Sequence, residues 1–302
     1  MDSTDISPYL ERIPLFQGTD PGERGFERLG GLTNLVYRVY LADRSYLLRI
    51  AGQGTEAYID RRVEAQDARV AAAAGVSAPV LFFDEADGLM LAEYIEGTTL
   101  DAEGFKDNGS LGRAALALRR MHRHPQAFQN RFDVFEKIDE YLDLVKQLEA
   151  PLPEGYHQVK QEADAVRRAL EAKPAALTPC HCDPLAENFI DTGNRVYIVD
   201  WEYAGNNDPM WDLGDVSVEA GFDADQDHLL LQTYFGGEPP ANQHGRMVMY
   251  KMLCDLLWTL WGIVQHANDN PAEDFWAYAT GRFERCRQLM DDPEFERHLR
   301  AL

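Results

Sequence analysis

The sequence predicts an α+β fold in two parts: an antiparallel five-stranded sheet with one helix at the N-terminus, then a larger and mostly helical part. Three patterns predict it. Short β-prone runs dominate residues 26–50 and return at 80–94, with a helical segment between them. From Gly97 onward the apolar residues recur at helical spacing. One hairpin pattern, at residues 189–199, interrupts the helices.

Length and charge limit the classes of protein. The chain has 302 residues, of which 45% are hydrophobic and 26% are charged, enough to bury a large core in one or two domains. Lys and Arg total 29 against 51 Asp and Glu, and the formal charge of −22 repels nucleic acid and anionic membrane surfaces. We therefore expect no nucleic-acid partner, and a small cationic substrate suits the charge. The sequence carries no signal for a particular oligomeric state.

Cysteine content and the longest apolar stretch predict where the chain resides. Four cysteines are too few for a disulfide scaffold of this size, and the N-terminus lacks a secretory signal, so we expect a reducing cytoplasm. Residues 180–182 read Cys-His-Cys and admit a zinc interpretation, but adjacent residues rarely converge on one ion, so structural thiols are preferred. The apolar stretch 247–264 includes Lys251 and Asp255, which predicts a buried helix without membrane insertion.

The first part begins with a segment that we expect to pack loosely. Residues 1–25 are polar and rich in Asp, Pro and Gly, which indicates an irregular lead-in. The runs FERLG (26–30), NLVYRVYL (34–41) and SYLLRI (45–50) then predict an antiparallel meander.

A helix and two further strands complete the first part. Residues 58–74 are helical by composition, and residues 80–84 and 89–94 predict two strands around a turn. The predicted domains are residues 1–96 and 97–302.

Helices fill the second part. Apolar spacing predicts helices at residues 111–122, 134–148 and 154–172. His122 ends the first of these, and we expect it to cap or pack, not to catalyse. Asp208 followed by proline is a typical helix start, because Asp caps the helix and proline fits its first turn.

One stretch of the second part holds candidate chemistry. Asp183 is followed five residues later by Asn188, and a short apolar run then ends in Asp200. A hydroxyl nucleophile needs a carboxylate to orient it and take its proton, and a nucleotide's metal ions need oxygen ligands nearby. Asp183 fits the first role, while Asn188 and Asp200 fit the second. The β-prone runs 189–190 and 196–199 predict a hairpin that brings Asn188 and Asp200 side by side.

These residues carry a resemblance to a known family. An HxDxxxxN motif, formed by His181, Asp183 and Asn188, precedes a strand and the sequence DWEYAGNNDPMWDLGD. With these motifs the chain resembles the choline/ethanolamine kinase family, within the aminoglycoside phosphotransferase-like and protein-kinase-like enzymes, from about Phe26 to Phe283. The resemblance implies a two-lobed protein-kinase-like fold, ATP and magnesium as cofactors, and a small amino-alcohol as acceptor.

The resemblance assigns nucleotide-binding roles in the first lobe. Arg49, where protein kinases carry Lys, would clamp the phosphates, and Glu64 would pair with it on the family's RxxE pattern. The alternatives are a solvated strand arginine and a Glu64 that pairs with Arg61 instead. Two neighbouring glycines are also an ordinary hairpin signal, but the resemblance makes their turn the phosphate-covering loop. That loop comprises Gly30, Gly31, Leu32, Thr33 and Asn34. Backbone groups of the hinge would bind adenine; the hinge residues are Glu93, Tyr94 and Ile95.

Several residues around the catalytic loop have supporting roles. We expect His181 to hold the loop by hydrogen bonding, and Cys182 departs from the small or amide residue that the family has there. Glu202, two residues after Asp200, would add a magnesium ligand, unless it is a solvated loop residue. Asp212 would brace the loop backbone.

Aromatic residues and a carboxylate suggest the acceptor pocket. Trp258 and Trp261 share one stripe of a long helix, a pattern that is usually core. The resemblance, however, places Trp258, Trp261 and Tyr278 on the rings that line the choline pocket, and Glu219 beside the substrate ammonium. Such a cage suits a quaternary ammonium. Carboxylates that converge with Glu219 in one cleft also need cations to offset their repulsion.

We therefore expect ATP-dependent phosphorylation of an amino-alcohol hydroxyl, with choline the foremost acceptor. Asp183 would deprotonate the hydroxyl, and Asn188, Asp200 and Glu202 would hold magnesium. The alternatives are a kinase of ethanolamine, thiamine or an aminoglycoside, and a catalytically silent kinase-like binding protein.

Overall fold

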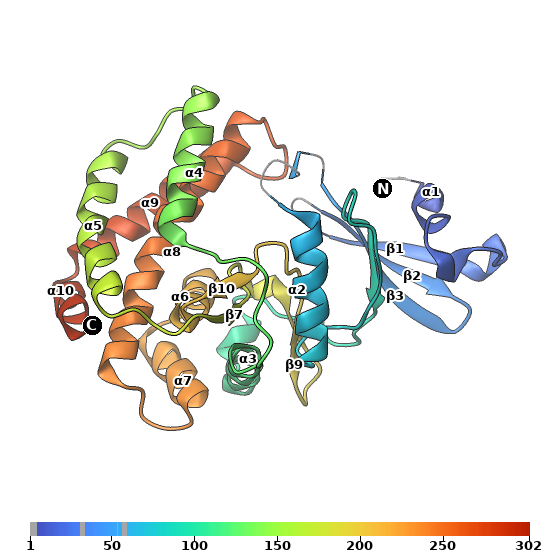
Figure 1. Ribbon diagram of the computed structural model, residues 1–302, viewed down its shortest axis with the longest axis horizontal. Coiled ribbons are helices and arrows are strands. Elements are labelled where there is room, and N and C mark those ends of the chain that lie inside the picture. Colours follow the sequence, from blue (N-terminus) through green and yellow to red (C-terminus); the bar gives the residue numbers. More distant parts are fainter. Residues whose placement is uncertain (1–4, 31–33, 53, 56–58) are drawn as a thin grey trace.

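The computed structural model of the protein describes residues 5–30, 34–52, 54–55 and 59–302. It has a lobe built on a sheet, a larger helical lobe, and helix α2 between the sheet and the hairpin region (Figure 1). The first lobe contains the predicted five-stranded antiparallel sheet in the order β1-β2-β3-β5-β4. Its strands are β1 (Arg24–Gly30), β2 (Leu35–Leu41), β3 (Arg44–Ile50), β4 (Val80–Phe83) and β5 (Met90–Glu93).

Helix α2 (Arg61–Ala73) follows β3, and Asp60 caps its N-terminus. The Asp60 carboxylate accepts from the backbone amides of Arg62 and Val63, which satisfies donors that the first helical turn leaves free. The sequence predicts an earlier start, at Tyr58, which lies outside the described residues.

The expectation of a loosely packed lead-in was wrong. This segment forms α1 (Ser7–Leu10) and short helical turns at Pro14–Phe16 and Pro21–Glu23. Four of its apolar side chains are buried against the sheet; they are Ile6, Leu10, Ile13 and Phe16. Their spacing of four, three and three residues is helical. This spacing could have predicted the packed segment, although its composition is polar.

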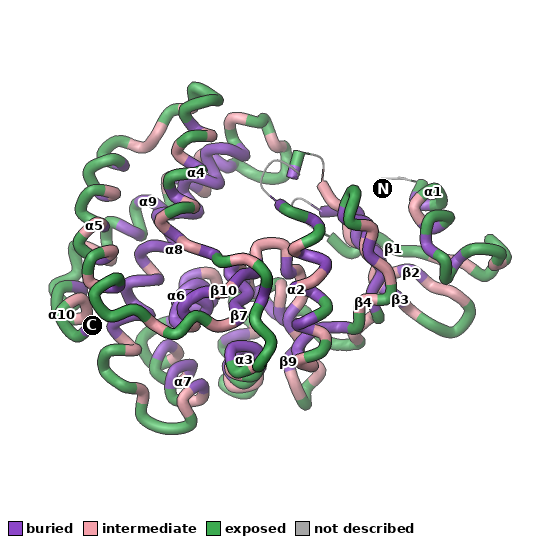
Figure 2. The backbone as a smooth tube through the Cα atoms, in the orientation of Figure 1, coloured by how far each residue is buried: buried purple, intermediate pink, exposed green. Residues whose placement is uncertain are grey.

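The second lobe packs around one central helix, α8 (Ala241–Ala267). By length and composition α8 could cross a membrane, but nearly all of its most apolar stretch is buried inside the protein, as predicted for a core helix. Figure 2 shows the burial of α8 among its neighbours. The other helices are α3 (Asn108–His122), α4 (Val134–Gln147), α5 (Tyr156–Ala172), α6 (Pro209–Glu219), α7 (Ala224–Phe235), α9 (Phe275–Asp291) and α10 (Pro293–Ala301).

The predicted hairpin is present between the two lobes. Strand β8 (Phe189–Asp191) pairs antiparallel with β9 (Val196–Ile198) and with the short β6 (Thr98–Thr99). A Cβ at Gly97 would lie 2.9 Å from the carbonyl oxygen of Asp191, so glycine is needed there because β8 approaches closely. Nearby, β7 (Thr178–Cys180) pairs with β10 (Gly205–Asn207).

Contacts also join the hairpin to the segment after α2. The backbone amide of Ile198 donates to the Val76 carbonyl at 2.7 Å, and the Trp201 indole donates to the Ser77 hydroxyl at 3.2 Å. The strand that leads to Asp200 is therefore fixed to the first lobe as well as to the second.

Candidate active site

A buried network under the catalytic loop fixes its backbone. The two carboxylate oxygens of Asp212 accept from the amides of His181 at 2.7 Å and Cys182 at 2.9 Å. His122 bonds to the same carboxylate at 2.9 Å and to the Tyr234 hydroxyl at 3.0 Å. The predicted bracing by Asp212 and the packed role of His122 are thus confirmed.

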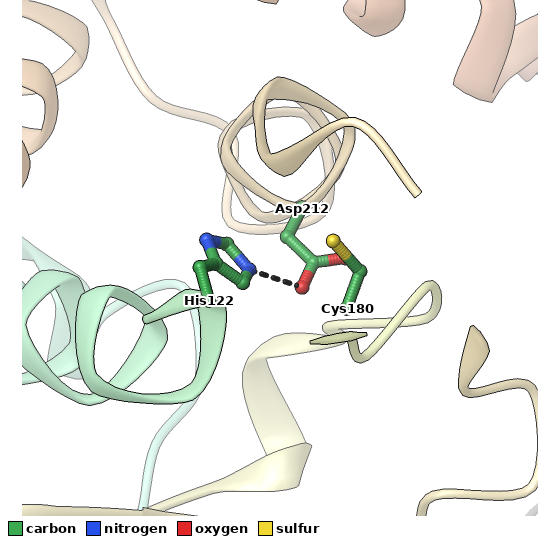
Figure 3. Close-up of side chains that lie close together, drawn as sticks. All are labelled: His122, Cys180 and Asp212. Atoms are coloured by element: carbon green, nitrogen blue, oxygen red, sulfur yellow. Dashed lines mark hydrogen bonds and ion pairs between the residues drawn. The ribbon is translucent and has the colours of Figure 1, made fainter. Parts of the chain in front are cut away.

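Cys180 lies beside this network, on the side of Asp212 away from His122 (Figure 3). The three side chains could offer one metal-ligand atom each, within 4.8 Å of one another. Burial, however, raises the pKa of the Cys180 thiol well above its usual value, with Asp212 adding to the shift. A protonated thiol is a poor zinc ligand, and Asp212 already accepts backbone bonds. All four cysteines are free and buried, as expected for structural thiols.

His181 joins the catalytic loop to the hairpin. Its Nδ1 accepts from the Asp183 amide at 3.3 Å, so the other nitrogen, Nε2, carries the proton and donates to the Val199 carbonyl at 2.8 Å. Burial lowers the pKa of His181, which keeps the ring neutral. The ring also packs on Trp201, with centroids 4.7 Å apart. His181 holds the loop, as the sequence analysis expected.

The loop places Asp183 and Asn188 in direct contact. The Asn188 side-chain amide donates to the Asp183 carbonyl at 3.0 Å, which leaves the side-chain oxygen of Asn188 available as a ligand. Burial raises the pKa of Asp183 well above its usual value; Glu219 adds to the shift and Arg282 opposes it. A carboxyl group with a raised pKa is a stronger base once it is ionised.

Asp200 stands at the open end of the hairpin, next to Asn188. The Val199 amide donates to the Asn188 carbonyl at 2.9 Å. This bond joins Asn188 to the residue before Asp200, so the two candidate ligands lie on neighbouring backbone. Asp200 has a φ of 64°, and Cys182, beside the candidate base, has a φ of 68°. Such left-handed conformations are costly for these residue types and concentrate at functional sites.

Two buried arginines face the candidate metal ligands. Arg49 pairs with Glu64, and it also contacts Asp200 at 3.2 Å. Arg61 contacts Glu64 at 2.7 Å and Glu202 at 3.1 Å. Glu64 therefore pairs with both arginines, and both partners that the sequence allowed for it, Arg49 and Arg61, are present. Arg49 is buried, which excludes a solvated strand arginine.

The donor set fits a hard divalent cation. The carboxylates of Glu64, Asp200 and Glu202 lie within 4.8 Å of one another, and Asn188 is the residue just before β8. Burial raises the pKa of Asp200 to about 7, and Glu202 adds to the shift while Arg49 opposes it. Crowded oxygen ligands of this kind suit Mg²⁺, whose charge offsets their repulsion. The Glu202 side chain is almost fully buried, so it is not a solvated loop residue.

Only the ends of the candidate phosphate-covering turn can be located. Gly31, Leu32 and Thr33 lie outside the described residues, and Gly30 ends β1. The side chain of Asn34 is buried; it donates to Glu202 at 3.2 Å and accepts from the amide of Gly52 at 3.1 Å. Asn34 thus links the first lobe to the metal-ligand cluster.

The candidate hinge follows β5. Glu93 is the last residue of that strand, and its amide donates to Pro79 at 3.0 Å. Tyr94 and Ile95 continue without regular secondary structure. The Arg38 guanidinium lies over the Tyr94 ring, 4.1 Å from the ring centroid. The Tyr94 side chain is therefore already in contact with another residue of the protein.

Glu219, the candidate carboxylate of the acceptor pocket, already forms an ion pair within the protein. Arg282 contacts Glu219 at 2.5 Å and Asp255 at 3.1 Å, and its guanidinium lies 4.6 Å from the Tyr278 ring centroid. The placement of Glu219 beside a substrate ammonium stays a prediction, and the structure adds that Arg282 already contacts this carboxylate. Arg282 follows Tyr278 by one helical turn, a spacing that could have indicated their contact.

The three predicted cage aromatics fall into two separate groups of contacting rings. Trp261 packs on Tyr278 with centroids 5.6 Å apart, whereas Trp258 packs on Tyr203 at 5.4 Å. Both tryptophans are buried, while Tyr278 is half-buried. Tyr203 was not predicted, although it follows Asp200 by only three residues.

Asp215 is a further acidic residue that the sequence analysis missed. Its carboxylate lies within 4.8 Å of Glu219 and accepts from the Cys254 thiol at 3.0 Å. Its other oxygen has no hydrogen-bond partner among the described residues. Burial raises the pKa of Asp215 well above its usual value, and Glu219 and Asp183 add to the shift. The candidate base and the acceptor carboxylates thus share one electrostatic environment.

Comparison with known proteins gives the geometry its context. A crystal structure of a choline/ethanolamine kinase family protein from Mesorhizobium loti is 53% identical, with 97% of this chain and 96% of that chain covered and a TM-score of 0.87. Choline kinase LicA from Streptococcus pneumoniae is 29% identical, with coverage of 88% and 92% and a TM-score of 0.77. Ethanolamine kinase 2 of Mus musculus is 26% identical over 84% of this chain and 73% of its own length.

More distant similarity concerns the fold alone. Aminoglycoside phosphotransferase APH(4)-Ia is 16% identical, with coverage of 89% and 94% and a TM-score of 0.64. The family model described as Choline/ethanolamine kinase matches residues 27–232, which is more than half of the sequence. The chain belongs to the choline/ethanolamine kinase family.

Proposed function

We propose that this protein is a choline kinase that transfers the γ-phosphoryl group of ATP to the choline hydroxyl in the presence of magnesium. Family membership already makes the chain a nucleotide-using phosphotransferase that acts on the hydroxyl of a small amino-alcohol. The choice of choline, the magnesium ligands and the residue roles are the proposed steps.

The observation that carries the proposal is the convergence of three candidate groups at the open end of one hairpin. Asn188 bonds to the Asp183 carbonyl at 3.0 Å, and the bond from the Val199 amide to the Asn188 carbonyl joins Asn188 to the residue before Asp200. A base, an amide ligand and a carboxylate ligand are thereby held on neighbouring backbone. Phosphoryl transfer depends mainly on such positioning and on charge stabilisation.

Asp183 acts as the base in this mechanism. Its carboxylate accepts the proton of the choline hydroxyl, the hydroxyl oxygen forms a bond to the γ-phosphorus, and the bond from that phosphorus to the ADP oxygen breaks. The products are phosphocholine and ADP, and no covalent enzyme intermediate is needed. The raised pKa of Asp183 supports this role, because a more basic carboxylate accepts a proton more readily.

Asn188, Asp200 and Glu202 would hold magnesium, which when bound neutralises charge on the nucleotide phosphates. Arg49, braced by Glu64, is positioned to donate to phosphate oxygens. Their burial in one cluster with Asp200 supports the assignment.

The two lobes have different roles in this proposal. Residues 1–96 would bind the nucleotide, and residues 97–302 would supply the catalytic loop and the acceptor pocket. The turn from Gly30 to Asn34 would cover the phosphates, and the backbone of residues 93–95 would contact adenine. A crystal structure of LicA in complex with AMP, 26% identical to this chain, supports nucleotide binding in this fold.

Aromatic rings near Glu219 support choline as the acceptor. The Tyr278 ring already has a cation, Arg282, on its face, and Trp261 packs beside that ring. A ring face attracts a quaternary ammonium, which has no N–H group to donate to carboxylates. A choline kinase, LicA, is among the relatives.

Asp215 favours ethanolamine as a second candidate acceptor. It places a buried carboxylate oxygen without a hydrogen-bond partner, among the described residues, within reach of Glu219. The primary ammonium of ethanolamine can donate three hydrogen bonds, so it would satisfy such an oxygen better than choline would.

A panel assay tests the proposal. Purified protein is incubated with ATP and magnesium and, separately, with choline, ethanolamine, thiamine and an aminoglycoside, and ADP release is compared with formation of each phosphate ester. The proposal expects choline to give the highest kcat/KM. Turnover of thiamine or an aminoglycoside above choline, or nucleotide binding without transfer to any acceptor, would reject it.

A further inference from the structure

A small pocket lies on the far side of the β8–β9 hairpin from the candidate active site. It has a volume of about 140 Å³ and lies between Val76, in the segment after α2, helix α3 and the hairpin turn. Figure 1 shows α3 and β9 next to each other below α2. Its lining includes Val76, Arg113, Leu116, Arg120, Asn194 and Arg195.

Two arginines converge on this pocket from different elements. The point where a Cβ would project from Gly75 lies 3.8 Å from the Arg120 Nη1 and 3.8 Å from the Arg195 Nη2. Arg120 belongs to α3, and Arg195 belongs to the hairpin turn, where its guanidinium covers the Tyr197 ring at 4.2 Å. The two guanidinium groups therefore lie within reach of one small anion.

Neither of these arginines has a carboxylate partner among the described residues, although the chain carries 51 Asp and Glu. The third arginine, Arg113, differs because Asp191 contacts it at 2.5 Å. Like charges that converge without a counter-ion repel each other, and an anion between them removes the repulsion. Arg120 is exposed and Arg195 is half-buried against Tyr197, so both can reach an anion at the mouth of the pocket.

Size and donor type define the class of anion. Drug-sized ligands occupy pockets of roughly 300–1,000 Å³, so this smaller pocket has room to enclose a single phosphate group. Guanidinium forks donate two parallel hydrogen bonds to phosphate oxygens. Leu116, half exposed at the rim, offers apolar contact to the carbon part of a phosphate ester.

We propose that the pocket between the segment after α2, helix α3 and the hairpin turn binds the phosphate group of a small anion through Arg120 and Arg195. Two sources share this chemistry: inorganic phosphate and a small phosphate monoester. The site is separate from the catalytic centre, because a strand of three residues, roughly 10 Å, separates the hairpin turn from Asp200. A bound anion would tie the hairpin to α3 beside Gly75 and Val76, which follow α2.

Isothermal titration with inorganic phosphate, against chloride of equal ionic strength, tests the site. We expect saturable binding that weakens about tenfold or more in Arg120→Gln and in Arg195→Gln, because each loses one charged donor. Arg168→Gln is the matched control: it removes the same charge from an exposed position on α5 and should bind phosphate as the wild type does. The Tm of each variant in chloride checks the fold.

A parallel titration with glycerol 3-phosphate distinguishes the two sources. Tighter binding than inorganic phosphate assigns the site to a monoester, and weaker binding assigns it to the free ion. The proposal is overturned if phosphate shows no saturable binding, or if both arginine variants retain wild-type affinity, since binding would then occur elsewhere, for example at the nucleotide site.

Discussion

Arg282 contacts Glu219 at 2.5 Å while its guanidinium lies over the Tyr278 ring. Two residues of the predicted acceptor pocket, Glu219 and Tyr278, thus share one arginine of the protein. Arg282 also opposes the rise in the pKa of Asp183. The pair therefore links acceptor recognition to the strength of the candidate base.

Replacing Arg282 should shift the pH dependence of the reaction. In Arg282→Gln the pKa of Asp183 loses an opposing charge and rises further, so the acid limb of the kcat/KM profile should move to higher pH. Breaking a buried ion pair should also cost about 3–5 kcal/mol of unfolding free energy. Kinetics between pH 5 and 9 and denaturant unfolding measure the two effects.

Two further variants separate charge from structure. Arg282→Lys keeps a cation and should return the acid limb toward the wild-type position. Arg285→Gln removes a half-exposed arginine that contacts the same Asp255 at 2.5 Å, so it should leave the limb in place. An unchanged limb in Arg282→Gln would show that Arg282 does not act on Asp183.

Asp183→Asn should separate binding from chemistry. The substitution keeps the size of the side chain but replaces one acceptor oxygen with an NH₂ donor and removes the base, so turnover should fall by a factor on the order of hundreds or more while ATP affinity stays nearly intact. Titration calorimetry with ATP and single-turnover kinetics test both parts. Glu187→Gln, at an exposed position of the same loop, is the control and should leave both unchanged. Near-normal turnover of Asp183→Asn would remove Asp183 from the mechanism.

The two carboxylates proposed as magnesium ligands should respond differently to substitution. Asp200→Ala should abolish activity at any accessible magnesium concentration, whereas Glu202→Ala should be partly rescued by more magnesium. Glu202 is held by Asn34 and Arg61, so its loss weakens the cluster without removing the carboxylate next to Asn188. Rates as a function of magnesium concentration measure this. Wild-type metal dependence in Asp200→Ala would contradict the assignment.

Asp67 should make stability depend on pH. It is fully buried on α2, and no side chain among the described residues donates a hydrogen bond to its carboxylate; the Gln129 backbone lies near enough to oppose part of the rise in its pKa. Burial raises its pKa to about 7, and Glu64 adds to the shift. The folded state therefore binds the proton more tightly than the unfolded state, so stability from this group is present below about pH 4 and is lost as pH rises through about 7.

Asp67→Asn should remove this loss. We expect the variant to be more stable than the wild type at pH 8, by on the order of 2–4 kcal/mol, and to show a smaller decline between pH 4 and 7. Asp143→Asn, at an exposed position of α4, removes the same charge and should leave the decline as it is. Denaturant unfolding at several pH values measures this difference. Equal pH dependence of stability in wild type and Asp67→Asn would show that Asp67 does not cause the decline.

Local patterns predicted the hairpin, its flanking ligands and the helix start at Asp208, because each depends on neighbours a few residues away. The Arg49–Glu64 contact was also predicted, but only through the family pattern. The packed N-terminal segment was missed because its helical spacing is hidden in a polar sequence.

Long-range pairings were not predictable in the same way. Arg282 and Glu219 are separated by 63 residues, and only the packing of α6 and α9 around α8 brings them together. Asp215 was missed because it lies in a helix with nearly all of its residues buried, so no polar face marked it as functional. Charged groups inside a core are placed by tertiary packing, which a local pattern does not encode.

Trp261→Leu should change acceptor choice. The substitution keeps an apolar side chain beside Tyr278 but removes a π face, so KM for choline should rise about two- to thirtyfold, and KM for ethanolamine should rise less. Trp276→Leu, a half-buried tryptophan of α9 that packs on His266, is the matched control and should leave both KM values unchanged. Loss of thermal stability with unchanged choline kinetics would make Trp261 a core residue only.

A competition assay tests the central claim most directly. Wild-type protein is given ATP, magnesium and equal concentrations of choline and ethanolamine, and ³¹P NMR measures the two phosphate esters in the same tube during initial turnover. The account predicts that phosphocholine forms faster and that Trp261→Leu reduces its excess over phosphoethanolamine. Phosphoethanolamine in excess with the wild type would contradict it.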